Sequence, residues 1–433
     1  MMKIKEKIQW LLKEGSFRRN VATMFSGTVV SQVVYLLFYP VLTRLYTPSH
    51  FGQYAIFLTF LSILSLLATG QYEQGILLPK KEKNVKVLSL GAIFIAAVMS
   101  ILLTAVLLLS RPVLQKYNLF NNSDIISFLG ISVFINALYQ IGIYLSLRKK
   151  DFKSISAINI LNVAFSILFQ AILSQTSLKE FGLSMGYMVG TLVSMGFLLY
   201  QNKRTFVIKN AFIELVGDAR NQLVRFKKFP LFNLPATLVN LLANQAPQIL
   251  LNTFGQSVVG YFSLSQRILG SPVTLFSTSL SHVFKEKASS DYRNKGNCEA
   301  IFVKTFKTLF MISIIPFLLV FIFSPFLVPI VFGSQWEMAS PYIQALTLMF
   351  FFKFTVSPLS YVIIIAEKQK LNLVLQSLLL ILIIISISIG LYRKDPLLAV
   401  ILYSIVYSFI YALFLLISYK LSKNGKKDSS ATR

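Results

Sequence analysis

The sequence predicts an all-α polytopic membrane protein, with 12 transmembrane helices in two six-helix bundles related by a parallel repeat around a central cavity. Three observations support this fold class. The 433 residues are 55% hydrophobic and only 13% charged, and the mean hydropathy is positive. Apolar windows long enough to cross a bilayer recur along the whole chain. The basic residues gather on one side of the arrangement that these windows imply.

Twelve apolar windows define the predicted spans. They lie near residues 21–43, 51–78, 87–109, 124–147, 154–174, 180–201, 230–252, 257–281, 305–332, 341–365, 371–391 and 396–419. If both termini are cytoplasmic, the outer loops hold only six of the 42 Lys and Arg residues. The positive-inside rule therefore predicts that orientation. It explains the net charge of +26 without nucleic acid and makes anionic inner-leaflet lipid a partner of the basic loops.

The longest predicted inner loop is basic and divides the spans into six and six. The first 20 residues also have an apolar helical face, which indicates a helix lying in the membrane interface. We therefore predict an N-terminal bundle with its interfacial helix over residues 1–202, a cytoplasmic linker over 203–229, a C-terminal bundle over 230–419 and a cytoplasmic tail over 420–433.

The two halves of the chain resemble each other weakly. An offset of 208 residues places Gly52 over Gly260 and Tyr54 over Phe262, each just inside a span that follows a short outer turn. Two bundles in parallel repeat are typical of transporters, in which a cavity between them opens alternately to each side.

Two predicted spans carry polar side chains at helical spacing. In the seventh span these are Asn233, Thr237, Asn240, Asn244, Gln248 and Asn252. The polar face of the first span includes Gln32 and Tyr35. Amides that face lipid are costly, so both faces are expected to point inward, where they line a cavity or join helices by hydrogen bonds. The continuity of the faces favours a cavity, and amides with aromatic rings suit a sugar.

Four ionisable residues are candidates for function. Arg267 is predicted near mid-bilayer, where its planar guanidinium either binds a phosphate in bidentate fashion or forms a structural ion pair. Lys353 is similarly deep, and either contacts a phosphate or packs among aromatic rings. Arg44 at the outer mouth attracts an anionic headgroup or anchors the helix. Glu73, about two turns from the inner end of the second span, is a cation or proton coupling site or the partner of a basic residue.

Composition excludes several kinds of chemistry. A single cysteine, Cys298, permits no internal disulfide framework, and two histidines, His50 and His282, are too few for a plausible metal cluster. The short outer loops leave no room for an extracytoplasmic catalytic domain. We therefore expect no metal, no cofactor and no catalytic residue.

Several sequence blocks resemble the Wzx-type oligosaccharide flippases of the polysaccharide transport family, within the multidrug/oligosaccharidyl-lipid/polysaccharide flippase superfamily. The blocks occur in the same order and cover most of the chain. They are LTRLYTPSHFGQYA (42–55), YEQGILLPKK (72–81), RKKDFKSIS (148–156), and GSQWEMASPYIQAL with SPLSYVIIIAEKQKLNLVLQ (333–346 and 357–376). The sequence departs from the family pattern at Gln71. In the family an arginine often precedes the Tyr-Glu pair, whereas here Gln71 precedes Tyr72 and Glu73. An ion pair between position 71 and Glu73 is therefore not expected.

The resemblance implies a multi-pass protein of the bacterial inner membrane that moves an undecaprenyl-diphosphate-linked oligosaccharide from the cytoplasmic to the periplasmic leaflet. Its product would serve O antigen or capsule synthesis, with a polysaccharide polymerase and a chain-length regulator as further partners. Three alternatives stay open: an ion-coupled exporter of small molecules or drugs in the same superfamily, a membrane enzyme of the polysaccharide polymerase or ligase type, and a passive scaffold in a polysaccharide assembly complex.

Overall fold

The computed structural model describes residues 17–116, 119, 123–203 and 212–423. Helices joined by turns and short irregular segments account for these residues, and no strand occurs among them. The all-α fold class is therefore confirmed. The predicted interfacial helix at residues 1–20 and the predicted tail at 420–433 lie mostly outside the described residues.

Each predicted span coincides with helical structure. Within the described ranges, nine helices are long and apolar enough to cross a membrane, and a tenth span is obtained if two helices bent by 49° are counted as one. Two helices in the middle of the chain, α12 (Leu234–Leu251) and α13 (Gln256–Lys295), are not among them. The total of 12 spans and the repeat therefore stay predictions.

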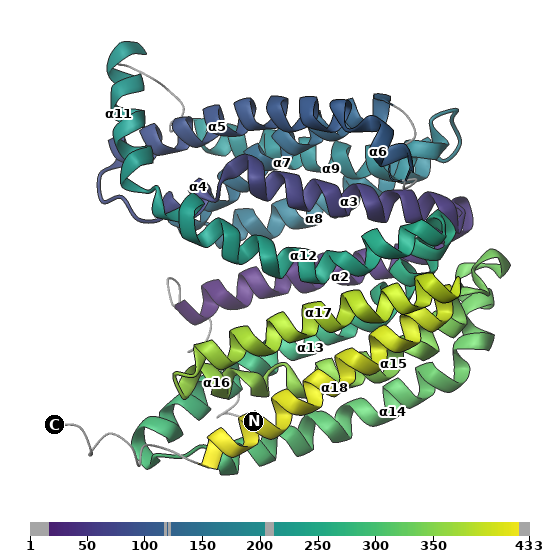
Figure 1. Ribbon diagram of the computed structural model, residues 1–433. Helices are drawn as coiled ribbons and strands as arrows, with labels where there is room; N and C mark the ends of the chain where they lie inside the picture. The colour runs from purple at the N-terminus through teal and green to yellow at the C-terminus, as the bar shows by residue number, and fades with distance from the viewer. Residues whose placement is uncertain (1–16, 117–118, 120–122, 204–211, 424–433) are drawn as a thin grey trace, which may run out of the picture. The chain divides into compact units, whose positions relative to one another are not determined.

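The chain forms two compact units, the first of which contains residues 1–46 and 53–245. Its long helices run side by side (Figure 1). The elements of unit 1 are α2 (Phe17–Leu45), most of α3 (Pro48–Thr69), α4 (Tyr72–Gly75), α5 (Glu82–Leu109), α6 (Arg111–Lys116), α7 (Ser123–Arg148), α8 (Phe152–Leu173), η1 (Lys179–Phe181), α9 (Gly182–Gln201), α11 (Phe212–Arg225), η2 (Phe229–Asn233) and the larger part of α12. The helix α11 stands across the end of α5 (Figure 1).

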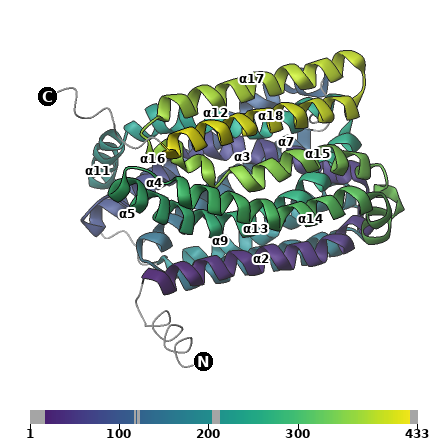
Figure 2. The ribbon, with the colours of Figure 1, turned by 90° about the horizontal axis from the view of Figure 1, so that it is seen from below.

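Unit 2 contains residues 47–52 and 246–433. Within it α15 packs on α13, α14 and α18, and α17 packs on α18 (Figure 2). Its elements are the first turn of α3, the end of α12, η3 (Asn252–Phe254), α13, α14 (Glu299–Phe332), η4 (Ser334–Trp336), α15 (Ala339–Val356), η5 (Leu359–Tyr361), α16 (Val362–Ile365), α17 (Gln369–Arg393) and α18 (Pro396–Lys423).

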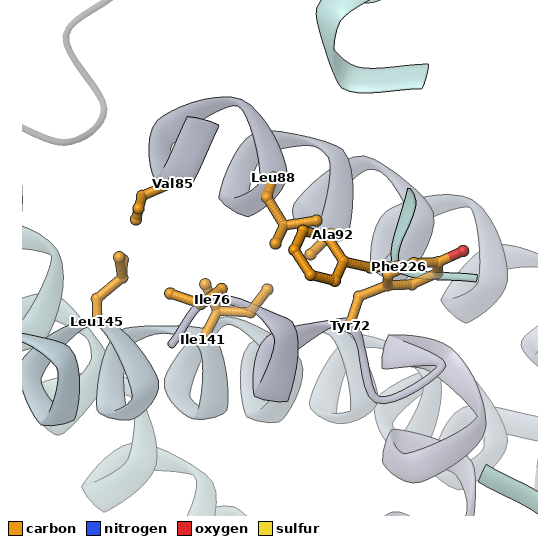
Figure 3. Close-up of a cluster of buried hydrophobic side chains, with 8 residues drawn as sticks. All are labelled: Tyr72, Ile76, Val85, Leu88, Ala92, Ile141, Leu145 and Phe226. Carbon is orange, nitrogen blue, oxygen red and sulfur yellow. The ribbon is translucent and has the colours of Figure 1, made fainter. Parts of the chain in front are cut away.

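A hydrophobic cluster closes one end of unit 1. Side chains from α4, α5 and α7 converge there, and Phe226, just after α11, packs onto them (Figure 3). Ile76 and Leu88 are fully buried in this cluster. It therefore holds the short helix α4 against the bundle, while the chain that follows α11 continues directly into η2.

Arg148 joins two of the sequence blocks at the same end of unit 1. Its Nη1 donates to the carbonyl oxygens of Ile76 and Leu77 at 3.3 and 3.2 Å, and its Nη2 donates to that of Pro79 at 2.7 Å. The same Nη2 also lies 3.4 Å from a Glu82 carboxylate oxygen. One guanidinium thus satisfies three carbonyl groups of the turn between α4 and α5, which its fork of donors allows.

Within unit 2, α3 and α13 cross closely at their first turns. A Cβ atom at Gly52 would overlap the carbonyl oxygen of Gln256, and one at Gly260 would overlap that of Pro48. The 208-residue offset found in the sequence relates both the two glycines and the two carbonyl groups of this crossing. Fully buried Trp336 lies beside it, with its ring centroid 5.1 Å from that of Phe51.

Gly52→Ala and Gly260→Ala are expected to destabilise the protein by about 1–3 kcal/mol each, because the added methyl group meets backbone that cannot rotate away. Gly196→Ala in α9 is the matched control, since its Cβ would meet no atom within 4 Å. That change should be neutral or slightly stabilising. Thermal unfolding of the purified variants measures the difference, and equal melting temperatures for all three would contradict the close crossing.

Candidate functional site

Unit 1 contains an open pocket of about 340 Å³. It is lined by Gln74 of α4, by Lys228 just before η2, and by Phe229, Phe232 and Asn233 of η2. A cation, two amides and two phenyl rings therefore share one concave surface. All five residues belong to the same compact unit.

A left-handed turn positions the α4 side of this pocket. The helix α3 ends at Thr69, and both Gly70 (φ 55°) and Gln71 (φ 59°) have positive φ before α4 begins. Left-handed backbone is uncommon at a non-glycine residue and persists only where its surroundings hold it. The Thr69 hydroxyl accepts a hydrogen bond from the Gln71 N–H at 3.3 Å. The predicted second span at 51–78 is therefore broken here, and α4 is a separate helix.

An amide cluster joins this turn to η2. The Asn233 Nδ2 donates to the Oε1 atoms of Gln71 and Gln74, the latter at 3.0 Å. Asn233 is the last residue of a π-helical turn, Phe229–Asn233, which contains Pro230. Such turns are rare and occur frequently at functional sites. Residues more than 150 positions apart in the sequence thus form one polar wall.

Glu73 lies in α4 between Gln71 and Gln74 and is only 7% exposed. Its Oε2 has no hydrogen-bond partner, while Thr69 bonds to the carboxyl group. Burial raises the pKa of the Glu73 carboxyl, and hydrogen bonds from its own backbone and from Thr69 oppose that shift only in part. Among the described residues no basic side chain pairs with Glu73, so the ion-pair interpretation has no partner there.

The two deep cations predicted from the sequence both lie in unit 2. Arg267 is half-buried on α13, and the hydroxyl of Ser271 donates to its carbonyl oxygen at 2.8 Å. Lys353 is half-buried on α15, with its Nζ 5.6 Å from the ring centroids of both Phe350 and Tyr407. Such contacts stabilise an ammonium without neutralising it. No carboxylate of the described chain forms an ion pair with Lys353.

The polar faces divide between the units. Asn240 and Asn244 are exposed on the part of α12 that belongs to unit 1, and the Asn244 amide donates to the Asn240 carbonyl oxygen at 2.8 Å. In unit 2, Gln248 donates to Gln266 at 3.2 Å, so it forms a hydrogen bond between helices. The roles of these residues stay predictions.

The first span places its candidates differently. Tyr35 is buried on α2, Gln32 is half-buried, and Arg44 is exposed near the end of the helix. The Tyr35 ring lies 5.5 Å from that of Tyr39, so the aromatic face continues along α2. The structure brings none of these three residues to the pocket.

Sequence reasoning missed most of the pocket. Asn233 belongs to the predicted polar face of the seventh span. Lys228 is one of several lysines in the predicted linker, and no pattern distinguishes it from the others. Gln74 follows Glu73 and is part of no helical periodicity. The only available signal was the change from a basic linker to an aromatic and amide segment at residues 228–233. Nothing in that segment indicates a π-helical turn.

Comparison with known families decides the identity of the chain. The family described as polysaccharide biosynthesis protein matches residues 41–341. The chain belongs to this family. A search of curated protein sequences finds no match.

Solved structures show that this polysaccharide biosynthesis protein has the fold of MurJ and the MATE transporters. The lipid II flippase MurJ in an inward closed conformation has a TM-score of 0.72 at 16% identity, covering 92% of this chain and 87% of MurJ. An inward-facing multidrug resistance MATE family transporter of the MOP superfamily has a TM-score of 0.64 at 14% identity, covering 90% and 96%. A mutant of the Vibrio cholerae MATE transporter VcmN has a TM-score of 0.55 at 12% identity, covering 93% and 95%. These neighbours are a flippase and transporters rather than enzymes.

In this family member, Glu73→Gln is expected to stabilise the fold by about 1–3 kcal/mol at pH 8, because it removes a buried charge that lacks a full set of hydrogen bonds. Burial raises the pKa of Glu73 in the folded protein above its value in the unfolded chain. The free energy of unfolding therefore falls as the pH rises from the unfolded-state pKa through the raised folded-state pKa. The stabilisation that Glu73→Gln gives should therefore shrink as the pH is lowered toward 4. Melting temperatures at both pH values measure it. Exposed Glu286→Gln is the control, and equal shifts for the two variants would contradict the burial argument.

Proposed function

We propose that this protein is a flippase that moves an undecaprenyl-diphosphate-linked oligosaccharide repeat unit from the cytoplasmic to the periplasmic leaflet, for O antigen or capsule synthesis. It would act in the bacterial inner membrane with both termini cytoplasmic, through alternating access. The family supports a role in polysaccharide synthesis, and the fold supports transport. No covalent step is needed, because the substrate leaves the protein unchanged.

The observation that supports this function best is the set of groups around the Lys353 ammonium. Lys353 lies in α15, which belongs to the bent helix pair that is apolar and long enough to count as a tenth span, yet its ammonium contacts only aromatic rings among the described residues. A cation at such a depth needs an anionic partner. A diphosphate passing through the protein would supply that partner in transit, and Arg267 would offer a bidentate donor set for the same group.

The exposed amides support the carbohydrate part of the substrate. Asn240 and Asn244 present donors and acceptors on α12, which suits sugar hydroxyls. The polyprenyl tail can stay in lipid throughout, so the protein has to shield only the polar headgroup. Anionic inner-leaflet lipids would contact the basic loops, and a polymerase with its chain-length regulator would take over the product.

An ion-coupled exporter of small molecules is the second candidate, because the MATE transporters share the fold and Glu73 is a buried acid with an unpaired oxygen. Under the flippase proposal, Glu73 would instead couple flipping to a proton. Glu73 lies in α4, outside the helices that qualify as spans, which favours the flippase over an exporter with an acid deep in its cavity.

The function is tested by deleting the gene and extracting the lipid-linked intermediates. We expect single undecaprenyl-diphosphate repeat units to accumulate on the cytoplasmic leaflet while surface polymer is lost. Units that cross normally but stay unpolymerised would indicate an enzyme or a scaffold. An unchanged distribution would favour the small-molecule exporter.

Lys353→Ala and Arg267→Ala are expected to lower flipping about 10- to 100-fold in the complemented strain, the cost of losing a hydrogen bond to a charged group. Lys307→Ala is the matched control, since Lys307 is an exposed lysine of the same unit. Surface polysaccharide at equal protein levels is the readout. Normal export by both deep-cation variants would refute the assignment of these residues.

A further inference from the structure

The α4/η2 pocket is lined by Gln74, Lys228, Phe229, Phe232 and Asn233 of unit 1, and its lining includes neither Arg267 nor Lys353, the cations of unit 2. It lies where the basic linker enters the seventh predicted span. The positive-inside prediction places this end at the cytoplasmic face. A molecule bound there would be held before it reaches the membrane interior.

The amide wall of the pocket is held in place before any ligand binds. Asn233 uses its Nδ2 on the two glutamine oxygens, and this fixes the rotamers of both partners. Within the described residues, the Asn233 Oδ1 and the Gln74 Nε2 have no partner, and neither is a buried unpaired atom. The wall therefore presents one acceptor and one donor to the pocket, the pair of groups that sugar hydroxyls require.

The rings supply an apolar face beside these amides. Phe232 is 71% exposed, and Phe229 is half-buried with its ring 6.3 Å from that of Phe226. Phe226 is part of the hydrophobic cluster of unit 1, so Phe229 is braced while Phe232 remains accessible. An exposed aromatic ring next to fixed amides suits the C–H face of a pyranose.

Lys228 supplies the charge. It is exposed, and in the described part of the chain it makes no ion pair. The acid nearest in sequence to the pocket, Glu73, is buried and is not among the lining residues. The ammonium of Lys228 is thus available to a phosphate oxygen, for which a lysine acts as a point charge.

The backbone on both sides of the pocket is unusual. Left-handed Gln71 holds one wall, and the π-helical turn Phe229–Asn233 forms the other. Each costs conformational free energy that plain α-helix would avoid. The hydrogen bonds from Asn233 to Gln71 and Gln74 join these two irregular segments at the pocket.

We propose that this pocket is a loading site that binds the glycosyl phosphate headgroup, with Lys228 on a phosphate, Gln74 and Asn233 on sugar hydroxyls, and Phe232 against the sugar ring. This inference rests on the proposed flippase function and adds a first binding step to it. The headgroup would be selected here and then passed to the deep cations.

The test is equilibrium binding of farnesyl-diphosphate-linked N-acetylglucosamine to the full-length protein in phosphatidylcholine nanodiscs. Lys228→Gln should weaken binding about 10-fold and Phe232→Ala about 3- to 10-fold. The adjacent changes Lys227→Gln and Leu231→Ala are matched controls, because both residues are exposed and neither lines the pocket. They should change affinity less than about twofold.

Three results would overturn the proposal. The first is wild-type affinity in both pocket variants, with folding verified by melting temperature. The second is binding of inorganic pyrophosphate as tight as that of the glycosyl probe, which would leave no role for the amides and ring. The third is loss of the Lys228 dependence in phosphatidylglycerol discs, which would make the pocket a site for ordinary lipid headgroups.

Failure of this proposal is distinguishable from failure of the proposed function. The leaflet distribution in the deletion strain does not depend on Lys228. A cytoplasmic accumulation of lipid-linked units together with wild-type affinity in both Lys228→Gln and Phe232→Ala would reject the loading site alone. An unchanged leaflet distribution, with no binding of the glycosyl probe by the wild-type protein, would reject both.

Discussion

The membrane gives polar groups no partner, so each polar group in a span has to be satisfied by the chain itself. This constraint explains many of the contacts within each unit. Hydroxyl groups donate back to carbonyl oxygens of their own helices, as Ser31 does to Gly27 and Thr347 does to Ile343. Between helices, the Tyr46 hydroxyl donates to the Gln170 carbonyl oxygen at 2.6 Å. Polar groups such as these are therefore satisfied within the described chain.

Two of the candidate residues lack a full set of polar partners among the described residues. Lys353 has rings but no acid beside it, and the Glu73 carboxyl has one oxygen without a partner. A buried polar group with its hydrogen-bond partners is explained by packing alone. A buried polar group without them lowers the stability of the fold, so its presence calls for another explanation. Under the proposed function, that explanation would be a passing anion for Lys353 and a proton for Glu73.

The end of unit 1 combines several local departures from regular helix. The left-handed turn after α3, the short helix α4 and the π-helical turn η2 meet within one compact unit. Arg148 and the hydrophobic cluster around Ile76 hold this region from behind. A rigid support with irregular backbone in front of it is the arrangement by which proteins position binding groups. The unit thus pairs a tightly packed base with an accessible polar surface.

The sequence by itself determined the helical class and the positions of the helices, because apolar windows are local signals that lipid makes unambiguous. The depth of Arg267 and Lys353 in the membrane stays a prediction. Tertiary structure decided the rest. The window at 51–78 is broken at Gly70 and Gln71, since the left-handed turn is stabilised by Asn233, a residue 162 positions away from Gln71. The pocket with Lys228 likewise depends on that long-range amide contact. A linear pattern carries no record of such a pairing, so only the folded chain could reveal it.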